Sequence, residues 1–372
     1  MLAERLADAR KQTDSLFEIV KPEALYDRPV AERHRIVFYL GHLEAFDSNL
    51  LTGGPHSELD KLFAFGIDPV GSGLPTDAPE DWPSIEEIQK YNRGIRARID
   101  QMPQDKQLWN VAIEHRLMHA ETLAYMLHQM PVDTKIPQAS SRLAANEVVP
   151  GMIRIPEGSV TLGLAEGFGW DNEFDAHEVH VKEFQIDRYK VTNGEYLKFV
   201  HAGGYEDESL KWLAERGIKR PVFWKNENVY RTMFAEIPMP LDWPVYVSHS
   251  EASAYARWAG KSLPTEAEWQ RAAQFSKPGN TDFERWDPVP VTADSSMIGN
   301  GWEWTSTLFK PFPGFQQFPF YPGYSANFFD DQHYVMKGGS ARTAACLLRP
   351  SFRNWFQPHY QYVYSGFRCV TR

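Results

Sequence analysis

The sequence predicts an α+β protein of two domains, in which a bundle of helices precedes a domain of short strands and irregular loops. The length of 372 residues suits two domains better than one ordinary core. Apolar residues recur at helical spacing through the first third of the chain. After about residue 150 the pattern changes to the alternation that is typical of strands, and then to loops rich in Gly, Pro and aromatic residues.

Residues 1–130 form the first predicted domain. Apolar periodicity predicts helices over 3–19, 31–51, 84–100 and 104–130, and helices of this length and number favour an up-down bundle. Ser84 with Glu87 three residues later is a capping box, which marks a helix start. The segment 53–83 is too long for a simple connection between helices, and such loops are often functional.

Residues 131–150 are polar and contain proline, which predicts a linker, and 151–372 form the second predicted domain. Alternation predicts strands within 152–162 and 178–187, and residues 251–259 read as a short helix. From residue 280 onward little periodicity remains, so we expect a domain held together by side-chain packing and irregular hydrogen bonds.

Composition excludes several classes of protein. A formal net charge of −10 argues against a nucleic acid partner, which needs a basic face. Cys346 and Cys369 are the two cysteines, too few for a disulfide framework or a thiolate zinc site. We expect two reduced, buried thiols, with a single bridge as the alternative. Neither an apolar signal core nor a run of about 18 apolar residues occurs, which predicts a cytoplasmic protein without a membrane partner.

Three histidines are the strongest candidates for chemistry. His115 and His119 are four residues apart in a predicted helix, so both rings lie on one face, whereas His42 interrupts the apolar stripe of another helix. Alone, the pair could be a coincidence and His42 a hydrogen-bonded core residue. Together, on the inner faces of two bundle helices, they predict a metal site.

Three neutral imidazoles would leave a divalent iron with its full charge, which favours an anionic further ligand such as a thiolate. Open positions would remain for substrate and oxygen. Three acids lie near the histidines in the sequence: Glu44, Glu114 and Glu121. Each is either a hydrogen-bond partner that orients a histidine ring or a solvated surface acid. His128 is the substitute ligand, whereas His177 and His180 fall on opposite faces of a predicted strand.

The motifs resemble those of a known family. The stretches GMIRIPEGSVTLG, GKSLPTEAEWQRAA, GNGWEWTSTLF, KGGS and GFRCV make residues 150–372 similar to the sulfatase-modifying-factor (formylglycine-generating enzyme) domain, which implies a C-type-lectin-like fold. The first half resembles a DinB-like four-helix bundle. Together they resemble the ergothioneine-type sulfoxide synthases, a likeness that implies Fe(II) on His42, His115 and His119. The cysteines are not placed like the catalytic pair of formylglycine-generating enzymes, because Cys369 belongs to the predicted GFRCV strand, so that activity does not carry over.

The same resemblance implies substrate residues. Tyr321, supported by Tyr324, would donate a proton or hydrogen atom during oxygen chemistry, since a phenol stays protonated at neutral pH. Asn354 would bind the polar end of the imidazole substrate, and Trp355 would contact its trimethylammonium group. The alternative is that these side chains are structural.

Two departures from the family pattern bear on the thiol. Synthases that use γ-glutamylcysteine share an acidic residue and an arginine at the positions where this chain has Phe356 and Tyr360. They also share arginines in the long loop between the second and third helices. Here 53–83 has no arginine, and Lys61 is its one base. We therefore expect Phe356 to line a site for cysteine or another small thiol or selenol. Met118 replaces a glutamine of some members, so recognition of hercynine could differ too.

The sequence thus predicts a non-heme iron(II) enzyme that uses O2 to join a thiol, cysteine rather than γ-glutamylcysteine, to the imidazole of hercynine or histidine. Selenoneine-type C–Se or ovothiol-type synthesis are alternatives with the same machinery. A thiol dioxygenase and a non-catalytic ligand-binding protein are the alternatives of other classes. The Asn354-Trp355 pair favours a synthase over a thiol dioxygenase. A thiol dioxygenase does not need residues that surround an imidazole substrate.

Overall fold

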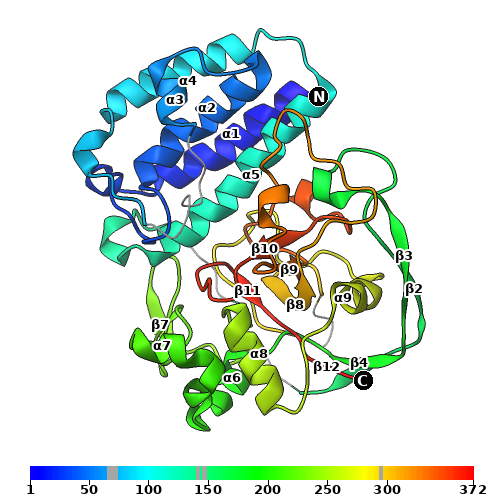
Figure 1. The fold of residues 1–372 in the computed structure, drawn as a ribbon. Coiled ribbons are helices and arrows are strands. Elements are labelled where there is room, and N and C mark those ends of the chain that lie inside the picture. Colours follow the sequence, from blue (N-terminus) through cyan, green and yellow to red (C-terminus); the bar gives the residue numbers. More distant parts are fainter. Residues whose placement is uncertain (65–73, 140–142, 145–148, 293–295) are drawn as a thin grey trace. The chain divides into compact units, whose positions relative to one another are not determined.

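The computed structural model describes residues 1–64, 74–139, 143–144, 149–292 and 296–372. The chain divides into two compact units, Met1–Ala139 and Ser140–Arg372 (Figure 1). The predicted linker over 131–150 spans this division and lies partly outside the described residues. An α+β chain with an N-terminal helical bundle is confirmed.

Helices make up the first unit. Its α-helices are α1 (Leu2–Glu18), α2 (Ile36–Thr52), α3 (Glu58–Leu62), α4 (Ile85–Ile99) and α5 (Lys106–Gln129), and its short 3₁₀ turns are η1 (Pro22–Ala24), η2 (Pro79–Asp81) and η3 (Val132–Thr134). The long helix α5 packs on α1 and on α2, and α2 also packs on α4. The bundle core therefore lies between α5 and its two neighbours, where α5 has a nearly continuous run of buried residues.

Helix ends follow from local side chains. The amide of Glu87 donates to Ser84 Oγ at 3.3 Å, and the amide of Ser84 donates to Glu87 Oε2 at 2.9 Å, so the predicted capping box is confirmed. Asp105 Oδ1 caps α5 by accepting from two backbone amides at 2.9 Å. Helix α2 begins at Ile36, later than predicted, because Arg35 is extended and the preceding residues form a turn.

The strands of the second unit are short and form several small sheets (Figure 1). Strands β1 (Met152–Ile155), β4 (Phe184–Asp187) and β12 (Val370–Thr371) form one sheet, in the order β1-β4-β12. A second sheet has the order β10-β9-β8-β11, from β8 (Trp302–Leu308), β9 (Tyr334–Lys337), β10 (Asn354–Phe356) and β11 (Ser365–Gly366). The remaining sheets pair β2 (Gly158–Leu162) with β3 (His177–Val181), and β6 (Val229–Arg231) with β5 (Trp224–Asn226) and β7 (Glu236–Pro238).

The second unit also contains α-helices. They are α6 (Asn193–His201), α7 (Lys211–Glu215), α8 (His249–Trp258) and α9 (Glu266–Ala273). Trp269 of α9 packs into a buried cluster with Phe184, Ile186 and Val370, while its Nε1 donates to Glu303 at 3.0 Å. Lys190 and Arg368 pair with Glu303 at 2.8 and 3.0 Å, which compensates its burial.

The predicted strands of 152–162 and 178–187 are each two strands, and the described chain after residue 280 consists mostly of loops, as expected, with a few short strands of which β8 is the longest. Strand β8 escaped notice because its first four residues are all buried, so the polar alternation that marks a half-exposed strand is absent. Cys369 lies between β11 and β12, which corrects its assignment to a strand. Within the described parts of the chain, no helix is long and apolar enough to cross a membrane.

Candidate metal centre and aromatic cluster

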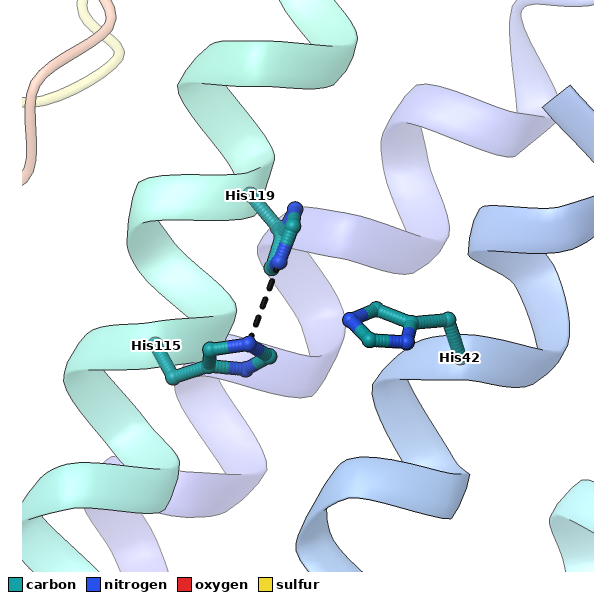
Figure 2. Close-up of side chains that lie close together, drawn as sticks. All are labelled: His42, His115 and His119. Carbon is teal, nitrogen blue, oxygen red and sulfur yellow. Dashed lines mark hydrogen bonds between the residues drawn. The ribbon is translucent and has the colours of Figure 1, made fainter. Parts of the chain in front are cut away.

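Two helices of the first unit bring three histidines to one place (Figure 2). His42 lies in α2, and His115 and His119 lie one turn apart on α5. The spacing of four residues places the last two rings on the same helix face. Because α5 packs against α2, this face meets His42 inside the bundle.

The ligand nitrogens of these rings all lie within 4.8 Å of one another. Nε2 of His115 and Nε2 of His119 are 3.1 Å apart, and the His42 ring centroid lies 5.0 Å from that of His119. The three side chains are 4%, 3% and 2% exposed in chain order. One metal ion is within reach of all three nitrogens.

Hydrogen bonding determines how His42 presents its ring. Its Nδ1 lies 2.7 Å from the carbonyl oxygen of Phe63, which can only accept, so Nδ1 carries the hydrogen and Nε2 keeps its lone pair. Among the residues that the structure describes, this buried Nε2 has no hydrogen-bond partner. A buried acceptor without a partner is costly, and a metal ion would satisfy it.

Aromatic rings hold the histidines in place. Phe46 stacks on His115 with centroids 3.4 Å apart and an interplanar angle of 11°. Phe38 stacks on His42 at 4.8 Å and 22°. These contacts fix the ring planes, so the nitrogens are oriented before any ligand binds.

Burial also fixes the charge of the histidines. It lowers the pKa of His42 to about 4, against the opposing effect of the Phe63 hydrogen bond. Burial, followed by the other imidazoles, lowers the pKa of His115 and of His119 well below the ordinary value. All three are therefore neutral at physiological pH, the state in which imidazole binds a metal.

Glu44 is neither a ring-orienting acid nor a solvated one. It is buried and pairs with Arg116 at 2.9 Å and with Arg96 at 2.7 Å. Arg116 also binds Asp47 at 2.6 Å and donates to the Leu43 carbonyl at 3.0 Å. This arginine, adjacent to His115 in the chain, thereby ties α5 to α2.

The other candidates around the histidines do not join them. Glu114, Glu121 and His128 are buried on α5, but within the described parts of the chain the potential metal-binding group contains only His42, His115 and His119. His177 contacts the carbonyl of Asp175, and His180 pairs with Glu157, so they form no shared site. Imidazole donors suit iron, zinc, copper and nickel, and the fit to a divalent transition metal is good.

Two of the predicted substrate residues, Tyr324 and Trp355, lie in an aromatic cluster of the second unit, which also contains Trp170, Phe309 and Phe328. Trp355 stacks on Phe309 at 4.1 Å and 8°, and Tyr324 meets its ring edge-on at 5.4 Å. Trp170 covers Tyr324 at 4.0 Å. Phe309 thus covers one face of the Trp355 indole.

Tyr321 and Tyr324 share one turn, with ring centroids 5.5 Å apart and both side chains half-buried. Asn354 and Phe356 flank Trp355 on β10, and Asn354 Oδ1 accepts from the Trp355 amide at 2.9 Å. Phe356 stacks on Tyr360 at 5.0 Å and 9°. The two residues that stand in place of the charged pair of the family pattern therefore form one aromatic pair.

Some features of both sites carried no sequence signal. The Phe63 carbonyl is a backbone group, which any residue could supply. Arg28 and Arg35 reach Asp77 in the predicted long loop, although that loop itself has no arginine; Arg35 Nε lies 3.0 Å from Asp77 Oδ2. The part of this loop over 65–73 lies outside the described residues. Cys346 and Cys369, both among the described residues, form no disulfide; Cys369 is buried, whereas Cys346 is only half-buried.

Comparisons with known proteins agree with this division of the chain. Residues 5–128 match the DinB superfamily, and residues 138–287 and 295–372 match the sulfatase-modifying factor enzyme 1-like domain. "Hercynine oxygenase" of Mycolicibacterium smegmatis is 32% identical, covering 99% of this chain and 98% of that protein. The protein of the same name from Mycolicibacterium thermoresistibile is 30% identical, covering 99% and 94%.

A fungal relative is longer. "Ergothioneine biosynthesis protein 1" of Neurospora crassa is 27% identical over 95% of this chain and 55% of that protein. The chain therefore spans about half the length of this relative.

Proposed function

The chain belongs to the family of ergothioneine-type sulfoxide synthases, and from this premise we propose that it is an iron(II)- and O2-dependent enzyme joining a thiol to the imidazole of hercynine. The reaction consumes one thiol, one imidazole C–H group and one O2. It yields the S-imidazolyl sulfoxide and one water, which balances atoms and electrons. Cysteine is the proposed thiol.

The observation that carries the proposal is the buried group of three neutral histidines. Within the described residues no carboxylate joins it, and the nearby acids Glu44 and Asp47 are bound by arginines instead. Three neutral ligands leave the charge of a divalent ion uncompensated, which favours a thiolate over a neutral ligand. Fe(II) held here would supply O2 activation and a binding position for the thiol sulfur.

This chain's own residues would bind the substrates and move protons. Trp355 would offer its indole to the trimethylammonium group of hercynine, a contact worth about 0.5–2 kcal/mol. Asn354 would hydrogen-bond the amino acid end of the same molecule. Tyr321 would hold a proton at its phenol oxygen and donate it to the reacting oxygen, with Tyr324 beside it.

The stacked pair of Phe356 and Tyr360 supports cysteine as the thiol. Related synthases that use γ-glutamylcysteine resemble one another in a charged pair at these two positions. A dipeptide with two carboxylates would meet uncharged rings here, and the desolvation of its second carboxylate would go uncompensated. A smaller amino acid thiol avoids this cost.

Oxygen consumption tests the proposal. The anaerobically purified protein, loaded with Fe(II), is mixed with hercynine or histidine crossed against cysteine, γ-glutamylcysteine and a selenol, and products are identified by mass spectrometry. We expect O2 uptake that requires both substrates and a coupled product mass with hercynine and cysteine. Sulfinate from thiol alone would establish a thiol dioxygenase. No uptake in any combination would establish a ligand-binding role.

A further inference from the structure

The 3₁₀ turn η4 (Asp171–Glu173), with Trp170 before it, contacts both segments that carry the proposed substrate residues. Trp170 stacks on Tyr324, and Asp171 binds Ser325, the next residue along. On the other side, Glu173 accepts from Arg349 at 2.8 Å and from Ser351 at 2.6 Å. These two residues precede Asn354 and Trp355 in the chain.

Asp171 anchors the tyrosine segment, residues 318–325, at both ends. The Ser325 hydroxyl donates to Asp171 Oδ1, and the amide N–H of Phe318 approaches the same carboxylate. Burial raises the pKa of Asp171, against the opposing effect of these hydrogen bonds. Asn172 Nδ2 donates to Ser325 Oγ at 3.0 Å from the neighbouring position. Asp171 and Asn172 are each 1% exposed and Ser325 is fully buried, so water does not replace these bonds.

The tyrosine segment has little structure of its own. Its internal backbone hydrogen bonds run from the Tyr321 amide to the Phe318 carbonyl at 3.1 Å, and from the Tyr324 amide to the Tyr321 carbonyl at 3.3 Å. No helix or strand of the described residues includes either tyrosine. Its placement therefore depends on tertiary contacts, among them the hydrogen bonds at its two ends.

We infer that Asp171 is a positioning residue, which holds Tyr321 and Tyr324 in the orientation that the reaction requires by binding Ser325 and Phe318. This inference rests on the proposed function, in which a phenol of this segment delivers a proton. A proton donor that is misplaced by about 1 Å lowers the rate of the reaction about 100-fold. The binding of the substrates before the reaction is not changed by this displacement. The carboxylate thus acts on turnover through Ser325, without contact with the reacting atoms.

The test compares Asp171→Ala, Asp171→Asn and Ser325→Ala, with Glu251→Gln as the matched control. Glu251 is another fully buried acid of the same unit, bound by Tyr205 and Gln361, and it makes none of these contacts. We expect Asp171→Ala to lower kcat about 100-fold. Its KM for each substrate and its iron content should stay within about twofold of the wild type, because ground-state binding is unaltered.

Two further readouts separate positioning from general damage. Asp171→Asn keeps an oxygen that accepts the hydrogen bond of Ser325. Its kcat should therefore be at least about tenfold higher than that of Asp171→Ala. Ser325→Ala should cost less in the Asp171→Ala background than in the wild type, because the bond between these two residues is then already lost. Since Asp171→Ala also risks misfolding, Ser325→Ala alone serves as the milder variant, with a smaller loss of kcat.

Nitration of the two phenols, followed by peptide mass spectrometry, supplies a readout that does not need turnover. Tyr321 and Tyr324 should react faster in Asp171→Ala than in the wild type or in Glu251→Gln. Unchanged nitration, or a kcat of Asp171→Ala equal to that of Glu251→Gln, would overturn the inference. A wild type that forms no coupled product while the nitration difference persists would instead refute the proposed function and leave the anchoring role of Asp171 in place.

Discussion

Nδ1 of His42 lies 2.7 Å from the carbonyl oxygen of Phe63, so the residue that follows the short helix α3 sets the tautomer of a candidate metal ligand. The other ring nitrogen of His42 then faces His115 and His119 with its lone pair available. This backbone contact connects the start of the predicted long loop to the metal centre. Changes that displace the Phe63 carbonyl should therefore alter metal affinity.

Removing one histidine should abolish iron binding. We expect His42→Ala, His115→Ala and His119→Ala each to lower bound iron from about one per chain to below about 0.1, since a site of two imidazoles keeps little affinity. Iron content of protein reconstituted anaerobically measures this. His56→Ala, an exposed histidine beyond α2, is the matched control and should retain full iron. Full iron in His42→Ala would show that α2 contributes no ligand.

Withdrawal of the metal should lower thermal stability. A ligand present at about 100 times its dissociation constant stabilises the folded state by about 2.7 kcal/mol. For a unit of this size we expect chelation of the metal to lower the apparent Tm by about 5–10 °C. Differential scanning calorimetry measures this shift. The His119→Ala protein should show no such shift, because it has no metal to lose. An equal shift in both would assign the effect to the chelator.

Breaking the buried ion network should destabilise the bundle. Arg116→Met leaves Glu44 and Asp47 as buried carboxylates that have lost a partner, which costs about 3–5 kcal/mol of unfolding free energy. Urea denaturation measures this. Arg154→Met breaks the exposed pair with Glu183 and should change stability by less than about 0.5 kcal/mol. A small effect of Arg116→Met would mean that the acids become protonated and hydrogen-bonded without it.

His249 should make the second unit sensitive to acid. It is buried at the start of α8 and stacks on Tyr334, and burial lowers its pKa from 6.5 to about 4. As the pH falls from 6.5 to 4, the unfolded chain binds a proton that the folded chain does not, so the folded state loses about 3 kcal/mol. Denaturation of His249→Phe at pH 7 and pH 4.5 should show a smaller loss than in the wild type, whereas exposed His201→Phe should match the wild type. Equal losses in all three would place the acid sensitivity elsewhere.

Trp355 should discriminate between methylation states of the imidazole substrate. Trp355→Leu removes a cation–π contact worth about 0.5–2 kcal/mol and should raise the KM for hercynine about 2- to 30-fold. The KM for histidine, whose amine is not quaternary, should change less. Steady-state kinetics with both substrates measures the ratio. An equal rise for both would mean that Trp355 shapes the site without contacting the ammonium group.

The sequence predicted those parts of the fold whose signal is periodic. The capping box at Ser84 and the apolar spacing of α5 are local, so they can be read without a structure. Strand β8 could not be read in this way, because Trp302, Glu303 and Trp304 are all buried and the acid is neutralised by distant cations. Buried pairing between remote residues leaves no pattern in a single sequence.

The same distinction between local patterns and distant contacts applies to the residues of the candidate sites. His115 and His119 were predicted from a local spacing, and their meeting with His42 follows from the packing of α5 on α2. Asp171 was not predicted, because its partner Ser325 lies 154 residues away. The roles of Tyr321, Tyr324, Asn354, Trp355 and Phe356 remain predictions that rest on the family resemblance and on the aromatic cluster.

All three candidate metal ligands belong to the unit Met1–Ala139, while the residues proposed to choose the substrates belong to Ser140–Arg372. Selection can therefore act on the two properties separately. A substitution at Phe356 or Trp355 changes which molecule is accepted and leaves every metal-binding side chain and its hydrogen bond untouched. New substrate preferences can therefore arise in such a protein through substitutions in the second unit alone, with the three histidines inherited unchanged.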